Sequence, residues 1–217
     1  EMVATDGRRL AMCKGTIGGP ADKEGKPVSC IVPTKALNMF QRLVKDPEEI
    51  VQVAITDNQI FFSLGGTGKD AKGDGSARAV LSSNLVEGAF PPYEEVVPRD
   101  QDKKVTFDRD VLSSAVRRAA LLTNEESRGV RMRFTGKEKQ LEVSSRAPEM
   151  GEAKIDVDLV GYDGEDIEIG FNPAFISDAL KVIADPEVIM ELKAPNRPGI
   201  MKSGGDFVYV VMPVNLS

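Results

Sequence analysis

The feature that most constrains this chain is the small number of helical segments among many strand-like ones. Only three stretches carry apolar residues at helical spacing, at 33–46, 108–123 and 172–185. Nearly everything else alternates apolar and polar residues with a period of two between turn signals, as strands do. A parallel doubly wound sheet needs a helix between successive strands and is therefore excluded. The sequence predicts an α+β fold with antiparallel sheets.

Two of the helical segments begin similar units. Residues 32–55 and 171–194 both run proline, amphipathic helix, Asp-Pro-Glu and strand, which indicates an internally duplicated architecture. Apolar residues vanish at 98–104, between two periodic regions, so we expect two domains, 1–98 and 99–217. The first contains one helix against two in the second. We therefore expect the chain to begin partway through its first domain.

The composition removes several classes of function. The chain has no histidine, which excludes Ser-His and Cys-His nucleophile arrangements and most zinc sites. Its two cysteines, Cys13 and Cys30, form no CxxC motif. No apolar run approaches the roughly 18 residues of a membrane span, so we expect an intracellular protein without membrane contact.

Acidic and glycine-rich turns offer two weaker hypotheses. The carboxylates at 46–49 and 163–166 could hold a metal ion, although Asp and Gly are also ordinary turn residues. The glycine-rich run at 64–76 lacks the hydroxyl residue and the following helix of a phosphate-binding loop, so a hairpin loop is expected there. We therefore expect no metal and no cofactor.

Basic residues gather on helix faces although the net charge is -6. Lys35, Arg42 and Lys45 share the polar face of the first helical segment. Arg117 and Arg118 lie away from the apolar stripe of the second. That stripe consists of Leu112, Ala115, Val116 and Ala119. Such segregation of charge is what sequence-independent contact with phosphates requires.

Two apolar features lie outside the predicted cores. Leu121 falls on the polar face of the second helical segment and, with Leu122 at the helix end, is a candidate contact for another subunit. The stretch 207–217 is apolar almost to its last residue, and Pro213 interrupts strand pairing there. The residues after Pro213 are therefore expected to line a surface or to dock in one.

Five stretches together resemble one known family, the bacterial sliding clamps that form the beta subunit of DNA polymerase III. The stretches are VATDGRRLA, VEGAFPPYEEVVP, RAALLTNEESRGVR, IGFNPAFISDALK and YVVMPVNL. They occur in the family's order and with similar spacing over essentially the whole chain. Five collinear motifs are far more specific than a lone short pattern.

The resemblance implies a chain of three similar domains, two copies of which form a head-to-tail homodimeric ring around double-stranded DNA. Residues 1–98 would be the latter part of the middle domain and 99–217 the complete third domain. In this DNA clamp fold, sheets form the outer wall and helices line the ring, so contact with DNA is sequence-independent. The implied DNA-facing residues are Lys35, Arg42, Lys45, Arg117, Arg118 and Lys181, and the implied subunit interface includes Leu121 and Leu122.

The resemblance also implies a peptide-binding groove between the middle and third domains, where polymerase, clamp loader and repair proteins dock a short motif. An apolar slot with polar groups at its rim suits such a peptide. Carried over by motif, the groove residues are Thr5, Gly7, Arg8, Arg9, Leu10, Pro91, Glu95, Val96, Asn172, Phe175, Val210, Met212, Pro213 and Val214. Arg8, Glu95 and Val214-Asn215 depart from the family pattern, in which histidine, a basic residue and Met-Arg are frequent. These exchanges bear on the peptide preference.

The resemblance therefore implies a cytoplasmic processivity factor of DNA replication, a non-catalytic subunit of a DNA-directed DNA polymerase. The alternative from another class is a carboxylate-dependent metal enzyme in a duplicated α+β fold. A clamp needs no divalent-metal site, whereas the enzyme needs acids that converge on one.

Overall fold

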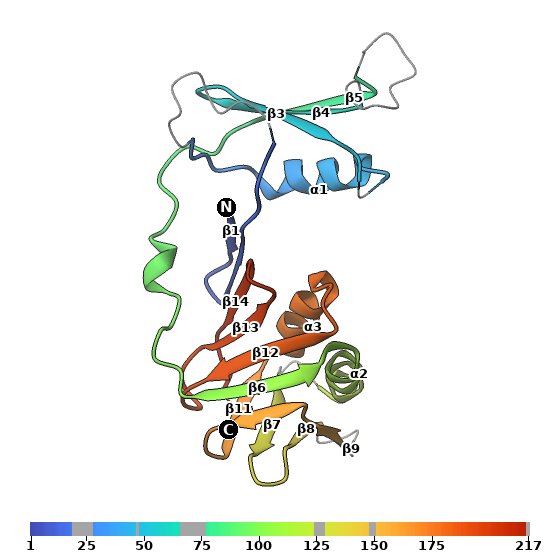
Figure 1. Cartoon of the computed structure of the whole chain (residues 1–217), viewed down its shortest axis with the longest axis vertical. Helices are drawn as coiled ribbons and strands as arrows, with labels where there is room; N and C mark the ends of the chain where they lie inside the picture. The colour runs from blue at the N-terminus through green and yellow to red at the C-terminus, as the bar shows by residue number, and fades with distance from the viewer. Residues whose placement is uncertain (19–27, 47, 66–76, 124–128, 148–150, 216–217) are drawn as a thin grey trace. The chain divides into compact units, whose positions relative to one another are not determined.

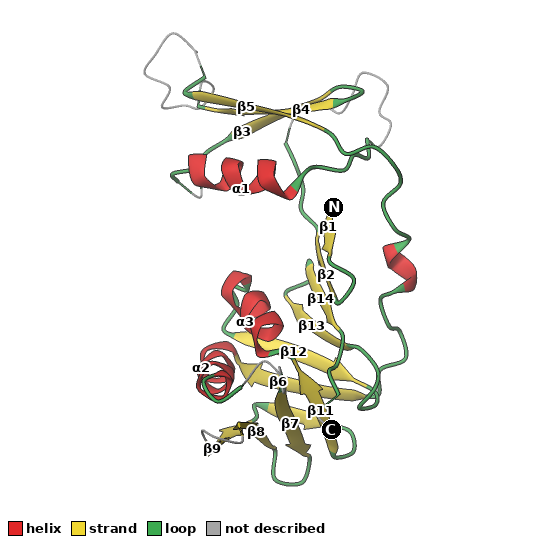
Figure 2. Ribbon diagram, turned by 180° about the vertical axis from the view of Figure 1, so that it is seen from behind, coloured by secondary structure: helices red, strands yellow, loops and turns green. Residues whose placement is uncertain are grey.

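The computed structural model describes residues 1–18, 28–46, 48–65, 77–123, 129–147 and 151–215. The chain forms two compact bodies, which are drawn in Figures 1 and 2. We call residues 1–17 and 92–217 the large body and residues 18–91 the small body. Most of the glycine-rich run predicted to be a hairpin loop, from 66 to 76, lies outside the described residues.

The large body contains two antiparallel sheets. A seven-stranded sheet has the order β1-β2-β14-β13-β12-β6-β10, and a four-stranded sheet has the order β11-β7-β8-β9. The strands of the first sheet, in that order, are Met2–Thr5, Arg9–Cys13, Phe207–Val211, Gly199–Ser203, Glu187–Leu192, Lys103–Asp108 and Gly161–Asp163. Those of the second are Ile167–Phe171, Val130–Thr135, Gln140–Ala147 and Gly151–Asp158.

Two neighbouring helices, α2 (Arg109–Ala120) and α3 (Pro173–Val182), pack against these sheets. At the start of α2 the Asp108 side chain accepts hydrogen bonds from the N–H groups of Asp110 and Val111, both at 2.9 Å. Asn172 caps α3 in the same way through the Ala174 N–H, and proline occupies the first helical position as predicted. Side-chain oxygens thus fix both helix starts.

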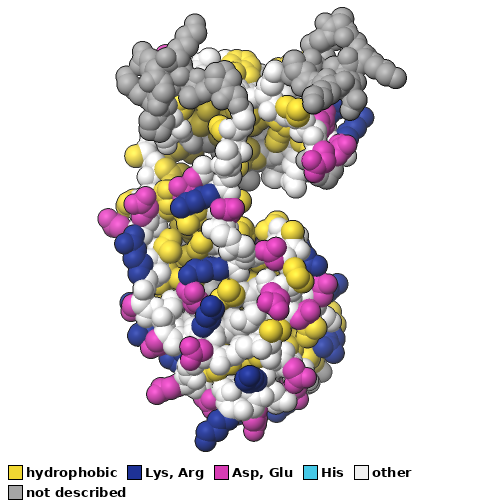
Figure 3. Space-filling view, viewed as in Figure 1, with side chains coloured by type: hydrophobic (Ala, Val, Ile, Leu, Met, Phe, Trp, Pro, Cys, Tyr) yellow, Lys and Arg dark blue, Asp and Glu magenta, His cyan; other side chains and the backbone are white. Residues whose placement is uncertain are grey.

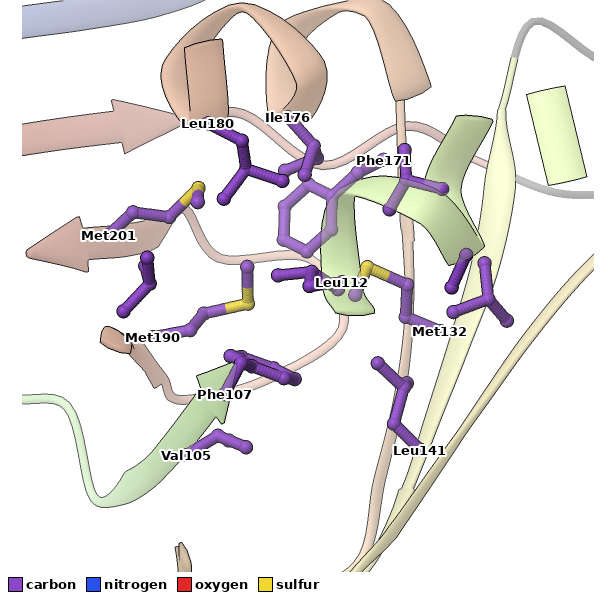
Figure 4. Packing of buried hydrophobic residues seen from close by; sticks show 14 of the residues in the cluster. Val105, Phe107, Leu112, Met132, Leu141, Phe171, Ile176, Leu180, Met190 and Met201 are labelled. Carbon is purple, nitrogen blue, oxygen red and sulfur yellow. The ribbon is translucent and has the colours of Figure 1, made fainter. Parts of the chain in front are cut away.

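The core of the large body joins both sheets to both helices. The apolar stripe predicted for α2 is fully buried, since Leu112, Ala115, Val116 and Ala119 are each 0% exposed. Figure 4 shows Leu112 among side chains of both sheets, including Met190 and Met132. Because this cluster excludes water from two layers at once, it holds α2 and α3 in fixed positions.

The small body is a single helix on a three-stranded sheet. Helix α1 (Thr34–Leu43) packs on strands ordered β3-β4-β5. The strands are Val51–Ile55, Gln59–Leu64 and Ala79–Asn84. The rings of Phe40 and Phe62 stack with centroids 4.5 Å apart. The pairs α1–β3 and α3–β12 correspond to the two repeated units of the sequence.

Two strands of the large body carry no clear sequence signal. Strand β13 is buried at almost every position, so its residues do not alternate. Strand β10 has only three residues and runs into the acidic turn at 163–166. The three helices are found as predicted, although each ends before its predicted C-terminal bound. None of the described helices is long and apolar enough to cross a membrane.

Candidate functional site

The hairpin between β1 and β2 is shaped by its own side chains. Gly7 has a φ of 82°, a conformation that glycine adopts without strain. The Thr5 hydroxyl donates to the Arg9 carbonyl at 2.9 Å and accepts from the Gly7 N–H at 3.2 Å. Asp6 Oδ1 accepts the N–H groups of Arg8 and Arg9, both at 3.0 Å. Thr5, Asp6 and Gly7 therefore form the turn, and the Arg8 side chain is exposed.

Arg9 ties this hairpin to α3 and β14. Its Nη1 donates to Asp178 Oδ2 at 2.8 Å and to the Tyr209 hydroxyl at 3.3 Å, and its Nε donates to Asp6 Oδ2 at 3.0 Å. The guanidinium carbon lies 4.5 Å from the centroid of the Phe175 ring. The Tyr209 hydroxyl in turn donates to the Phe175 carbonyl at 3.0 Å. These contacts hold a cation over an aromatic ring while the Arg9 side chain stays 28% exposed.

The electrostatic contacts define the charge state of this cluster. Hydrogen bonds from Arg9 and then from Lys181 lower the pKa of Asp178 below its ordinary value of 3.8. Pairing with Asp178 raises the pKa of Arg9. Burial raises the pKa of Tyr209 above 10.0, although the Arg9 cation acts in the opposite direction. At neutral pH the cluster therefore holds a cation, a carboxylate and a neutral phenol.

The C-terminal tail is bonded to the hairpin and to β11. The Met212 N–H donates to the Arg8 carbonyl and the Val214 N–H to the Gly170 carbonyl, both at 2.9 Å. The Met212 side chain is 40% exposed, whereas Pro213 and Val214 are half-buried. Val214 is thus bonded to β11, and Met212 lies beside the hairpin turn.

Two of the residues predicted for the groove are buried, and a third caps a helix. Leu10 and Val210 face each other across β2 and β14 and are only 2% and 1% exposed. The Asn172 side chain is engaged in capping α3. We give the name hairpin-tail surface to the exposed and half-buried residues of the hairpin at 5–9, Phe175 and the tail 212–214. Leu10 and Val210 therefore support this surface from within the sheet, whereas Asn172 is partly exposed and fixes the start of α3.

The remaining predicted groove residues lie on the connection that precedes β6. Pro91 belongs to the small body, whereas Glu95 and Val96 belong to the large body, within and just after the short 3-10 helix η1 (Tyr93–Glu95). Both of these side chains are exposed. No hydrogen bond or ion pair among the described residues joins Glu95 or Val96 to the hairpin-tail surface.

Two members of the Arg9 cluster were not predicted from the sequence. Asp178 lies one helical turn after Phe175, so the spacing along α3 would have placed it on a neighbouring position of the same face. Tyr209 is 5% exposed, and a buried hydroxyl needs a hydrogen-bond partner. Its partner depends on the pairing of β14 with β2, which no local pattern encodes.

The residues predicted to face DNA are all exposed. They are Lys35, Arg42 and Lys45 in the small body and Arg117, Arg118 and Lys181 in the large body. Leu121, predicted at a subunit interface, is 73% exposed directly after α2, and Leu122 is half-buried. On the face of the large body seen in Figure 3, Lys and Arg side chains are interspersed with Asp and Glu. That face therefore presents no single-sign field.

Comparison with known proteins places the chain in one family. Residues 1–92 match the central domain and residues 94–215 the C-terminal domain of the DNA polymerase III beta subunit. The chain is 35% identical over 216 residues to a beta sliding clamp of Pseudomonas putida, covering 99% of this chain and 54% of that protein. It is 34% identical to the beta sliding clamp of Escherichia coli K12, with the same coverage.

Solved structures share the fold. The DNA polymerase III subunit beta of Pseudomonas aeruginosa superposes with a TM-score of 0.83 at 33% identity, over 98% of this chain and 54% of that one. The DNA polymerase sliding clamp of Bacillus subtilis gives a TM-score of 0.85 at 27% identity, over 99% and 53%. A further sliding clamp structure from P. aeruginosa is bound to griselimycin and gives a TM-score of 0.83.

These likenesses define the class as the DNA sliding clamps, and the α+β architecture is the DNA clamp fold. The chain belongs to the DNA polymerase III beta subunit family. It spans about half the length of the curated relatives it matches. The carboxylate-dependent metal enzyme has no support among these relatives, and the described residues contain no group of three His, Cys, Asp or Glu that could hold a metal ion.

Proposed function

We propose that the protein acts within a sliding clamp, a ring that encircles double-stranded DNA and serves as a processivity factor of DNA replication. The carrying observation is the family match over both 1–92 and 94–215, supported by clamp structures that cover nearly all of the chain. In this proposal the protein is a non-catalytic, cytoplasmic subunit, and the full-length protein is a homodimer. Leu121 and Leu122 belong to the proposed subunit interface.

The proposed boundary between the two domains lies at the stretch without apolar residues that the sequence shows at 98–104. Residues 1–98 are the latter part of the middle domain, and residues 99–217 are the third domain. The meeting of the two family matches between 92 and 94 supports a division in this region. The pairing of β2 with β14 nevertheless joins the first residues of the chain to the sheet of the third domain.

The proposed docking site for polymerase, clamp loader and repair proteins includes the hairpin-tail surface together with Glu95 and Val96 of the same body. Three properties of the surface support this assignment. It combines an exposed thioether at Met212, a fixed guanidinium at Arg9 and an aromatic ring at Phe175. Apolar contacts flanked by a few oriented polar groups are suited to holding a short peptide. The griselimycin complex of a relative provides a ligand with which to test it.

Contact with DNA is proposed through exposed basic side chains of the three helices and, for Lys45, of the segment that follows α1. They are Lys35, Arg42, Lys45, Arg117, Arg118 and Lys181. Each can pair with a phosphate without reading a base, so the binding is expected to be sequence-independent and to weaken as salt rises. A ring that retains DNA by enclosing it needs no stronger contacts.

Removal of residues 212–217 is the experiment that tests the docking site. The deletion takes away Met212 and the backbone bond to Arg8, so griselimycin binding should be abolished in isothermal titration calorimetry. Met212→Ala should weaken binding about tenfold, because a partly exposed contact side chain is truncated. Met2→Ala is the matched control, since Met2 is 66% exposed at the opposite end of the same hairpin. Unchanged affinity in the deletion would remove the hairpin-tail surface from the proposed site.

A further inference from the structure

Asp178 is a single carboxylate shared by two cations whose proposed roles differ. Its Oδ2 lies 2.8 Å from Arg9 Nη1, and its Oδ1 lies 2.9 Å from Lys181 Nζ. Arg9 belongs to the hairpin-tail surface. The Lys181 side chain is 71% exposed on α3 and is one of the proposed DNA-facing residues. One side chain of α3 thus connects the proposed docking site with the proposed DNA-facing residues.

The two cations compete for the charge of Asp178. Each oxygen accepts one charge-assisted hydrogen bond, and the carboxylate remains 43% exposed, so each pairing is modest and sensitive to the other. A phosphate that binds Lys181 draws its ammonium group away from Asp178. The carboxylate then has Arg9 as its remaining cationic partner, and a second negative charge lies nearby. Both changes strengthen the pairing of Asp178 with Arg9.

A stronger pairing fixes the Arg9 guanidinium more firmly. Nη1 is already directed at Asp178 and the Tyr209 hydroxyl, and the group lies over the Phe175 ring. A side chain held in its bound orientation before the ligand arrives loses less conformational entropy on binding. Occupation of Lys181 by a phosphate should therefore improve ligand binding at the hairpin-tail surface.

We propose that Asp178 is a positioning residue that couples the two sites, so that phosphate contact at Lys181 and ligand docking at Arg9 favour each other. The inference rests on the proposed function, because it assigns DNA contact to Lys181 and docking to the surface around Arg9. Coupling of this kind is reciprocal. Its size is limited to about twofold in affinity, because it passes through an exposed ion pair.

Lys181→Gln tests the coupling without DNA, because it removes the competing cation permanently. Griselimycin affinity, measured by calorimetry, should rise about twofold in this variant. Lys137→Gln is the matched control, since Lys137 is an exposed lysine with no ion pair among the described residues. It makes the same change in net charge and should leave the affinity unchanged. In an Asp178→Asn background, Lys181→Gln should have no effect, whereas a purely structural role of Asp178 would leave the effect in place.

Short duplex DNA at low salt provides the second arm. It should tighten griselimycin binding about twofold in the unmodified protein and not at all in Lys181→Gln. Equal affinities of Lys181→Gln and Lys137→Gln, or a DNA effect that persists in Lys181→Gln, would overturn the coupling and leave the docking function standing. Failure of the unmodified protein to bind griselimycin would overturn the proposed docking site and the coupling together.

Discussion

The large and small bodies contain the same helix-turn-strand unit but bury it to different extents. In the large body, Val188, Met190 and Leu192 of β12 are 0% exposed. In the small body, Val53 and Ile55 of the corresponding strand β3 are 54% and 40% exposed, although Val53 pairs with the buried Phe62. The difference arises because α1 contacts β4 and β5, whereas α2 and α3 share a core with two sheets. Burial of a repeated unit is thus decided by what covers it.

The two bodies nevertheless stabilise the end of that helix in the same way. Arg78 Nη2 donates to the Leu43 carbonyl at the end of α1 at 3.0 Å. Arg109 Nη1 donates to the Ile183 carbonyl at the end of α3 at 2.8 Å. In each case an arginine from outside the helix satisfies a carbonyl that the helix leaves unpaired and complements its dipole. This feature depends on local geometry and not on the size of the core.

The largest expected difference between the bodies concerns the loss of a buried ring. Phe107→Ala should lower the free energy of unfolding of the large body by about 4 kcal/mol. Phe107 is 0% exposed, and the surrounding core can relax only partly into the cavity that the substitution leaves. Phe62→Ala should cost the small body less, about 3 kcal/mol, because Phe62 is slightly exposed and its sheet is only partly covered. Urea denaturation with hydrogen exchange read separately for each body checks this. Equal losses would contradict the comparison.

A smaller difference is expected at the helix starts. Asp108→Ala removes the two hydrogen bonds that cap α2 and should cost about 1 kcal/mol. Helix α1 follows Pro33 and has no side-chain cap, so Thr34→Ala should change the stability of the small body by less than about 0.5 kcal/mol. Thermal unfolding followed by circular dichroism measures both. A loss in Thr34→Ala as large as that in Asp108→Ala would show that the absence of a cap is not the relevant difference.

The smallest expected effect is a shared one, the loss of ion pairs in acid. Lys103 and then Lys193 lower the pKa of Asp102 to about 2, and Arg78 lowers that of Glu49 below 4.5. Because both folded pKa values are depressed, the stabilisation is present above the unfolded values and is lost as the pH falls through the folded ones. For Asp102 this window runs from 3.8 down to about 2. The stability difference between Asp102→Asn and the unmodified protein, measured by denaturation at several pH values, should shrink across it. A difference independent of pH would exclude this ionisation.

Local patterns predicted the elements of the fold well, and their pairing less well. The positions of Leu112, Ala115, Val116 and Ala119 were readable because helical periodicity reflects burial directly. Strand β13 was not, since a strand buried at almost every position has no alternation. The register that sets Val210 opposite Leu10 is fixed by contacts nearly the whole chain apart. Sequence periodicity reports the environment of a residue and not the identity of its neighbours.

The candidate site, too, was only partly predictable from the sequence. The motif around Gly7 and the tail at Met212 were singled out from the sequence, and the structure joins them through the Arg8 carbonyl. Asp178 and Tyr209 were missed because neither residue type is unusual where it stands. Their importance comes from the approach of Arg9, which depends on the sheet. The assignment of these residues to peptide docking stays a prediction.

The hydrogen bonding of Tyr209 has a practical consequence for optical measurements. The chain contains no tryptophan and only three tyrosines, so tyrosine emission is not masked. One of these phenols lies directly beneath the hairpin-tail surface, with its hydroxyl bonded to Arg9 and to the Phe175 carbonyl. A ligand that displaces the guanidinium would alter the environment of that fluorophore. Binding could therefore be followed by intrinsic ultraviolet fluorescence, without any label attached to either molecule.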